Sequence, residues 1–192
     1  MDKSSQEIAT VNTKAEYGTA KKRLNPTKRI TYLATLVAAA LAFKLLGQVL
    51  TFGGFKITIV YIPWILSALV MGPIGGMTVC FATDVIGTLI LPTTGLPLPL
   101  IVVSNSLFGL IMGLAFKIPK LNLRLKTLIG TAVVICVCTL GLSTYALADF
   151  YNIPFWVMFV DRISQAVMVA VNAAATVFLF PTLKKLGLID KT

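Results

Sequence analysis

The sequence predicts an all-α integral membrane protein with six transmembrane helices in a compact bundle and both termini in the cytoplasm. Hydrophobic residues make up 57% of the 192 residues and charged residues only 12%, whereas about a quarter of a soluble domain is charged. Apolar segments of about 20 residues, enough to cross a bilayer, recur along the chain. Lys and Arg gather at alternate ends of these segments, which is the pattern that orients membrane helices.

Six segments are apolar enough to be spans. The second is short and interrupted by Pro63, and it is joined to the third by a tight turn at Gly72–Gly76. We predict spans at Ile30–Leu50, Phe55–Met71, from the turn to Leu91, Leu98–Phe116, Thr127–Leu147 and Ile153–Leu183. Residues 30–185 then form the membrane domain, between a basic cytoplasmic tail at 1–29 and a short cytoplasmic tail at 186–192.

The basic residues explain both the orientation and the net charge of +10. Seven precede the first span, four lie between the fourth and fifth spans, and three follow the sixth. Only Lys44 and Lys56 lie near the first loop on the opposite side. This asymmetry places both termini in the cytoplasm and requires an even number of spans. The positive charge is therefore no sign of nucleic-acid binding.

The chain lacks the residues of several enzyme classes. It has no His, which excludes a Ser/His/Asp triad, and it has no glycine-rich phosphate loop. Three Cys in apolar segments suggest neither a metal site nor a disulfide framework, so no cofactor is expected. A membrane-embedded lipid-modifying enzyme, the alternative class, would need clustered carboxylates or His, but only four acidic residues follow the tail. A structural subunit without a ligand is a third possibility.

Polar residues inside the apolar segments are the candidate substrate ligands, because polar groups at membrane depth are costly and usually functional or paired. They cluster toward the outer half of spans three to six. The candidates are Asp84, Ser104, Asn105, Tyr145, Asp161, Arg162, Gln165 and Asn172. For Tyr145 an interfacial belt position is the alternative, for Asn105 a bond to a neighbouring helix, and Trp64 and Trp156 are open between belt, packing and ligand contact.

The sixth span carries the densest polar set. Asp161, Gln165 and Asn172 share one helical face, and Arg162 shares a neighbouring face with Gln165. An arginine here can hold a carboxylate through two parallel hydrogen bonds, or it can extend to the water interface instead. Asp84 is either a ligand-binding acceptor or the partner of Arg162 or of a backbone donor.

Small residues mark two helical faces. Ala34, Ala38 and Ala42 follow one another every four residues along the first span, so they share a flat face that another helix can approach closely. That helix either belongs to the same bundle or to a partner protein. Gly109 and Gly113 form a second such face in the fourth span, for which packing inside the bundle is expected.

Together these residues resemble the substrate-binding membrane subunit, or S component, of an energy-coupling factor (ECF) vitamin transporter. The alanine face resembles the family's docking motif, and MGPIGGMTVCFATDVIGTLILP resembles the folate and pantothenate branch, with its Asp-hydrophobe-hydrophobe-Gly element at Asp84–Gly87. The resemblance implies a subunit that is not itself an enzyme and lies in a prokaryotic plasma membrane. It implies capture of a vitamin at the outer face, docking through Ala34, Ala38 and Ala42 on a transmembrane coupling subunit, toppling, and ATP hydrolysis by two cytosolic ATPases.

The substrate is expected to be pantothenate. The folate branch has an aromatic, Gly-rich stretch before the fourth helix, where this chain has Leu96–Ile101 without an aromatic residue. A smaller carboxylate-bearing vitamin suits this sequence better, although folate or another small vitamin is the alternative. Arg162 would bind the carboxylate, while Asn105, Asp84 and Gln165 would bind hydroxyl and amide groups.

Overall fold

The computed structural model describes residues 26–49, 58–90, 98–119 and 121–185. The chain divides into two units, Met1–Thr31 and Tyr32–Thr192. In the first unit the described residues are the opening turns of a helix, where the Thr31 hydroxyl donates a hydrogen bond of 3.0 Å to the Thr27 carbonyl. The second unit holds the rest of that helix and all the others, and every predicted site residue lies in it.

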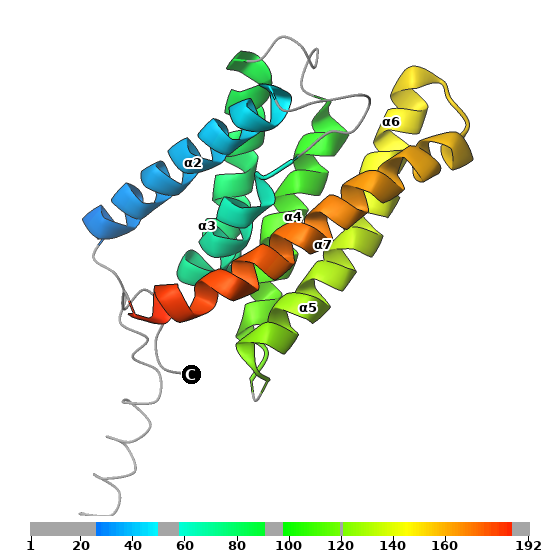
Figure 1. Ribbon diagram of the computed structural model, residues 1–192. Helices are drawn as coiled ribbons and strands as arrows, with labels where there is room; N and C mark the ends of the chain where they lie inside the picture. Colours follow the sequence, from blue (N-terminus) through cyan, green and yellow to red (C-terminus); the bar gives the residue numbers. More distant parts are fainter. Residues whose placement is uncertain (1–25, 50–57, 91–97, 120, 186–192) are drawn as a thin grey trace, which may run out of the picture. The chain divides into compact units, whose positions relative to one another are not determined.

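The described residues form helices and no strand, which confirms the all-α prediction. The elements are α2 (Pro26–Val49), α3 (Tyr61–Ile90), α4 (Pro99–Lys117), α5 (Leu123–Val134), the π-helix η2 (Ile135–Leu142), α6 (Ser143–Tyr151) and α7 (Phe155–Lys185) (Figure 1). Because α5, η2 and α6 follow without a gap, they form one rod. Five described segments are long and apolar enough to cross a membrane. Six spans and cytoplasmic termini stay predictions.

Helix α3 contains two of the predicted spans. Gly72 leaves the helical conformation, with φ 78° and ψ −169°, and Pro73 starts a new helical arm, as proline does at a first helical position. A Cβ added to Gly76 would lie 2.9 Å from the Ala68 Cα. In a straight helix these residues would be about 12 Å apart, so the two arms fold back on each other.

This break corrects two predicted boundaries. The turn is shorter than Gly72–Gly76, because Gly72 alone departs from helical geometry. The helix predicted from Phe55 begins at Tyr61, since residues 58–60 are not helical and 55–57 lie outside the described residues. The described first arm, 61–71, is about 16 Å long, roughly half the thickness of a bilayer's hydrocarbon core.

Glycines let α3 and α4 pack with their backbones in contact. A Cβ on Gly109 would lie 2.4 Å from the carbonyl carbon and oxygen of Gly76, and one on Gly113 would lie 2.3 Å from the Pro73 Cα. These spacings are too short for any side chain. The predicted packing role of Gly109 and Gly113 is therefore confirmed, and it fixes the second arm of α3 against α4.

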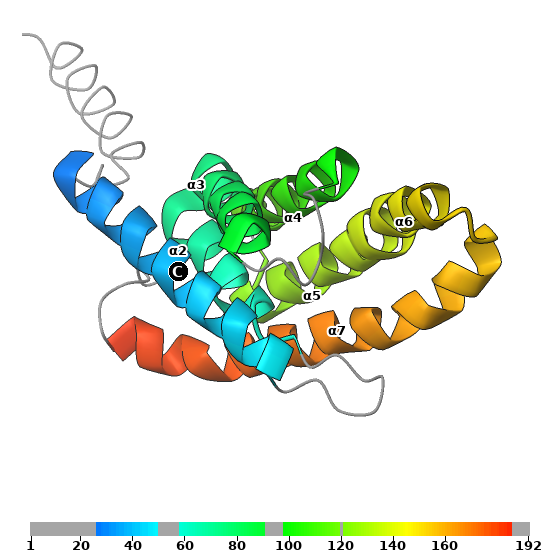
Figure 2. The ribbon, with the colours of Figure 1, turned by 90° about the horizontal axis from the view of Figure 1, so that it is seen from above.

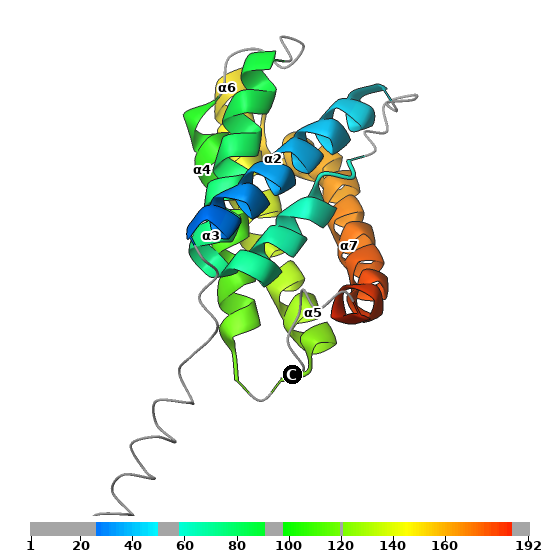
Figure 3. The ribbon, with the colours of Figure 1, turned by 90° about the vertical axis from the view of Figure 1, so that its left-hand side faces the viewer.

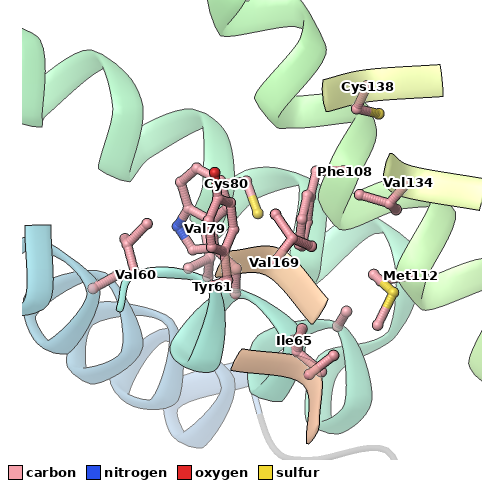
Figure 4. Close-up of a cluster of buried hydrophobic side chains, with 14 residues drawn as sticks. Val60, Tyr61, Ile65, Val79, Cys80, Phe108, Met112, Val134, Cys138 and Val169 are labelled. Atoms are coloured by element: carbon pink, nitrogen blue, oxygen red, sulfur yellow. The ribbon is translucent and has the colours of Figure 1, made fainter. Parts of the chain in front are cut away.

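The remaining helices complete the second unit. Helix α4 also packs against α5, η2 and α6, and α7 contacts α3 and the whole α5–η2–α6 rod. Figures 2 and 3 show α7 running beside this rod and turning back from the end of α6. Between α3, α4 and α7 the side chains of Tyr61, Val79, Phe108 and Val169 point toward one another (Figure 4). This buried cluster is the hydrophobic core between the three helices.

Candidate functional site

Two groups of contacting polar residues include Lys44 and Asp84 in one and Arg162 in the other. Lys44, Asp84 and Arg162 are five to seven residues from the nearer end of α2, α3 and α7 respectively, which is about 8–10 Å along a helix. Figure 1 shows these three helix ends toward the top of the view. Of the predicted set, Asp84 and Arg162 lie toward this end, and the clustering of the whole set stays a prediction.

Asp84 forms an ion pair that crosses from α3 to α2. The Lys44 Nζ donates to Asp84 Oδ1 at 2.9 Å and approaches the Asp84 carbonyl oxygen at 3.5 Å. Asp84 is only 5% exposed. The sequence suggested Arg162 or a backbone group as its structural partner, and that interpretation is wrong about the partner. Lys44 could have predicted this pair from the sequence, because a charge inside an apolar span requires a counter-charge.

Gly87 explains how the lysine reaches this carboxylate. A Cβ at Gly87 would lie 2.7 Å from Lys44 Cδ and 2.8 Å from Nζ. The lysine side chain thus lies over the glycine, one helical turn beyond Asp84. Any larger residue at position 87 would push the ammonium group away from its partner.

A second polar chain links α7 to the start of α3. Arg162 Nη1 donates to Gln165 Oε1, and Gln165 Nε2 donates to the Tyr61 hydroxyl at 2.7 Å. The predicted neighbourhood of Arg162 and Gln165 is confirmed. Tyr61 and Asp84 both belong to α3, so this chain and the Lys44–Asp84 pair share that helix.

Asn172 of α7 makes a structural contact with the segment that precedes α3. Its Nδ2 donates to the carbonyl oxygens of Thr58 and Met168, both at 2.7 Å. Asp161, in contrast, is exposed, because burial along α7 begins beyond its first turns. Of the three residues predicted to share a face of this helix, Gln165 and Asn172 therefore point inward and Asp161 does not.

Three aromatic rings pack beside the Arg162–Gln165–Tyr61 chain. Tyr61 and Phe108 are stacked with centroids 5.4 Å apart, and Trp64 meets both rings edge-on at 5.6 and 5.4 Å. Trp64 is 3% exposed, and its indole Nε1 makes no hydrogen bond in the described part of the chain. Trp64 is thus a core residue, whereas Trp156 is 74% exposed. Sequence reasoning missed Tyr61 and Phe108, which lie in apolar runs.

Three other predicted ligands, Ser104, Asn105 and Tyr145, lie on α4 and α6. Ser104 Oγ bonds Ser143 Oγ at 2.9 Å and donates to the Cys138 carbonyl at 3.0 Å, so it joins α4 to η2 and α6. Asn105 is half-buried on α4, and Tyr145 is 60% exposed on α6. Their roles as ligands stay predictions.

The alanine face of α2 points away from the core. Ala34, Ala38 and Ala42 are exposed, while Ala40 is fully buried. Leu33, Leu36 and Val37 pack against the core cluster on the same side as Ala40. Packing of the alanine face inside this chain is therefore excluded within the described residues.

Comparison with known proteins identifies the family. The family of ECF transporter substrate-specific components matches residues 28–185. The chain belongs to this family. A crystal structure of FolT bound with folic acid is similar to this substrate-specific component, with a TM-score of 0.66 and 23% identity over 80% of this chain and 92% of that one. At this identity the likeness establishes the fold. No curated protein matches the sequence.

Proposed function

We propose that this substrate-specific component captures a small carboxylate-bearing vitamin, with pantothenate as the first candidate. The observation that carries the proposal is the Arg162–Gln165–Tyr61 chain beside a buried aromatic cluster. Arg162 uses one nitrogen for Gln165, and a guanidinium has further donors with which to bind a carboxylate in the bidentate manner.

The charges near Tyr61 favour an anionic substrate. Lys44 and Asp84 neutralise each other in their ion pair, which leaves Arg162 with the uncompensated charge. Asp161 also influences Arg162, but it is exposed, and exposed charges are weakened by solvent screening. An anion therefore gains more than a cation from this region.

Folate is the second candidate, because one observation favours it. The argument for pantothenate rests partly on Leu96–Ile101, and residues 96 and 97 lie outside the described residues. Tyr61, Trp64 and Phe108 are aromatic residues beside the Arg162–Gln165 pair, although their rings pack on one another and are buried. The similar fold of FolT, which was crystallised with folic acid, supports the same candidate.

Delivery of the bound vitamin would depend on docking through the outward-facing Ala34, Ala38 and Ala42. A face of small residues permits close approach of another helix in lipid, which suits docking on a transmembrane coupling subunit. Toppling of the loaded subunit and ATP hydrolysis by two cytosolic ATPases would then release the vitamin into the cell. This scheme requires a plasma membrane of a prokaryotic type, the vitamin end outside, and both termini in the cytoplasm, as the basic residues predict.

Ligand binding to the purified protein tests the substrate. The protein in detergent is titrated with pantothenate and, separately, with folate, while the fluorescence of its two Trp residues is followed. We expect one of them to bind at micromolar concentration or tighter, and Arg162→Ala to weaken that binding. If neither vitamin binds, the proposed substrate class is wrong.

A further inference from the structure

Only one of the two carboxylate oxygens of the buried Asp84 takes part in the ion pair with Lys44. Oδ1 accepts the hydrogen bond from Lys44 at 2.9 Å. Oδ2 is buried and makes no hydrogen bond in the described part of the chain. An unsatisfied carboxylate oxygen away from water carries a large desolvation cost. Within the described residues Oδ2 is thus an acceptor that a donor of a bound molecule could satisfy.

The charge of the pair restricts which donor suits it. Lys44 already supplies a positive charge, with its Nζ 2.9 Å from Asp84 Oδ1. A cation at Oδ2 would meet Lys44 as a like charge, whereas a hydroxyl or an amide N–H would add a hydrogen bond without repulsion.

We propose that Lys44 is a specificity-determining residue, which holds Asp84 as a neutralised acceptor so that Oδ2 binds a hydroxyl or amide N–H of the substrate. Lys44 also cancels the charge with which Asp84 would repel the substrate's own carboxylate. This inference rests on the proposed capture of a carboxylate-bearing vitamin, and it assigns a role to a residue of α2.

Charge rescue tests the inference directly. Lys44→Met leaves an uncompensated carboxylate, and we expect it to weaken vitamin binding at least about tenfold. The double variant Lys44→Met/Asp84→Asn restores neutrality and keeps an acceptor oxygen, so it should bind within about threefold of the wild type. Lys117→Met, at an exposed lysine near the end of α4, is the matched control and should bind normally.

Gly87→Ala provides a second test that keeps both charged residues. The added methyl group would occupy the space of the Lys44 Cδ and Nζ atoms. Because alanine favours a helix interior more than glycine does, the fold should be retained. We expect weaker vitamin binding with an unchanged or higher unfolding temperature. Binding equal to that of the wild type would overturn the role of Lys44 even if the lysine variants fail to fold.

The wild-type titration separates this inference from the proposed function. If the wild type binds neither pantothenate nor folate, the proposed function and the inference fall together. If the wild type binds but Lys44→Met binds equally well, only the inference is overturned. If the double variant is as weak as Lys44→Met, the lysine contributes contact rather than neutralisation, and the inference is again wrong.

Discussion

Adding one methyl group to either of two helical glycines should have opposite effects on stability. At Gly109 the new Cβ would lie 2.4 Å from backbone atoms of Gly76 on α3. Ordinary contacts are at 3.5–4.0 Å, so α3 and α4 must separate by about 1 Å along a backbone seam that cannot rearrange locally. At Gly87 the clash is with the flexible end of Lys44.

We expect Gly109→Ala to lower the free energy of unfolding by about 1–3 kcal/mol, the usual cost of overpacking. Gly87→Ala should leave it unchanged or raise it by up to about 1 kcal/mol through helix propensity. Thermal unfolding of the two variants in the same detergent, followed by circular dichroism, measures the difference. If Gly109→Ala unfolds at the wild-type temperature or above it, the backbone contact between α3 and α4 is wrong.

Four further predictions concern binding, docking and the turn in α3. Arg162→Ala should weaken binding of an anionic vitamin by about 2–4 kcal/mol, measured by titration of purified protein; unchanged affinity would remove Arg162 from the site. Tyr61→Phe deletes the hydroxyl that receives the Gln165 hydrogen bond, and it should weaken binding less than Arg162→Ala does, by about 1 kcal/mol. Ala38→Leu should leave binding and stability intact but abolish vitamin uptake by cells, and a collapse of binding would contradict an outward alanine face. Gly72→Ala should cost about 1–3 kcal/mol of stability from backbone strain alone, because its Cβ would meet no atom within 4 Å and φ is 78°; an unchanged unfolding temperature would argue against this turn.

Local signals predicted the helices well. The fourth span was predicted at Leu98–Phe116 and α4 is Pro99–Lys117, because a proline and a lysine mark its ends. The contact between Arg162 and Gln165 also follows from spacing along one helix. The fifth span is continuous, as predicted, but the sequence did not predict the π-helical segment η2 at Ile135–Leu142 within it. No residue pattern in ICVCTLGL distinguishes a π-helix from an α-helix.

The site itself depends on contacts that spacing does not determine. Lys44 and Asp84 are 40 residues apart, and Tyr61 and Gln165 are 104 apart. Hydrophobic periodicity is weak in a helix surrounded by apolar groups on every side, so the sequence did not reveal which face of α2 turns inward. That rotation decides whether Lys44 meets water or Asp84. It also decides whether the alanine face is internal.

The orientation of α2 about its own axis therefore determines both the partner of Lys44 and the exposure of the alanine face. Ala42 and Lys44 are two residues apart, so they point about 200° away from each other around the helix. Because Lys44 reaches the buried Asp84 and Ala40 is fully buried, Ala34, Ala38 and Ala42 must face outward, as their exposure shows. Helix α2 thus carries the partly buried charge of Lys44 on one face and a flat small-residue face on the other. The same helix takes part in both the proposed vitamin site, through Lys44, and the proposed docking surface. Loss of Lys44 should consequently disturb binding first, whereas loss of the alanine face should disturb uptake alone.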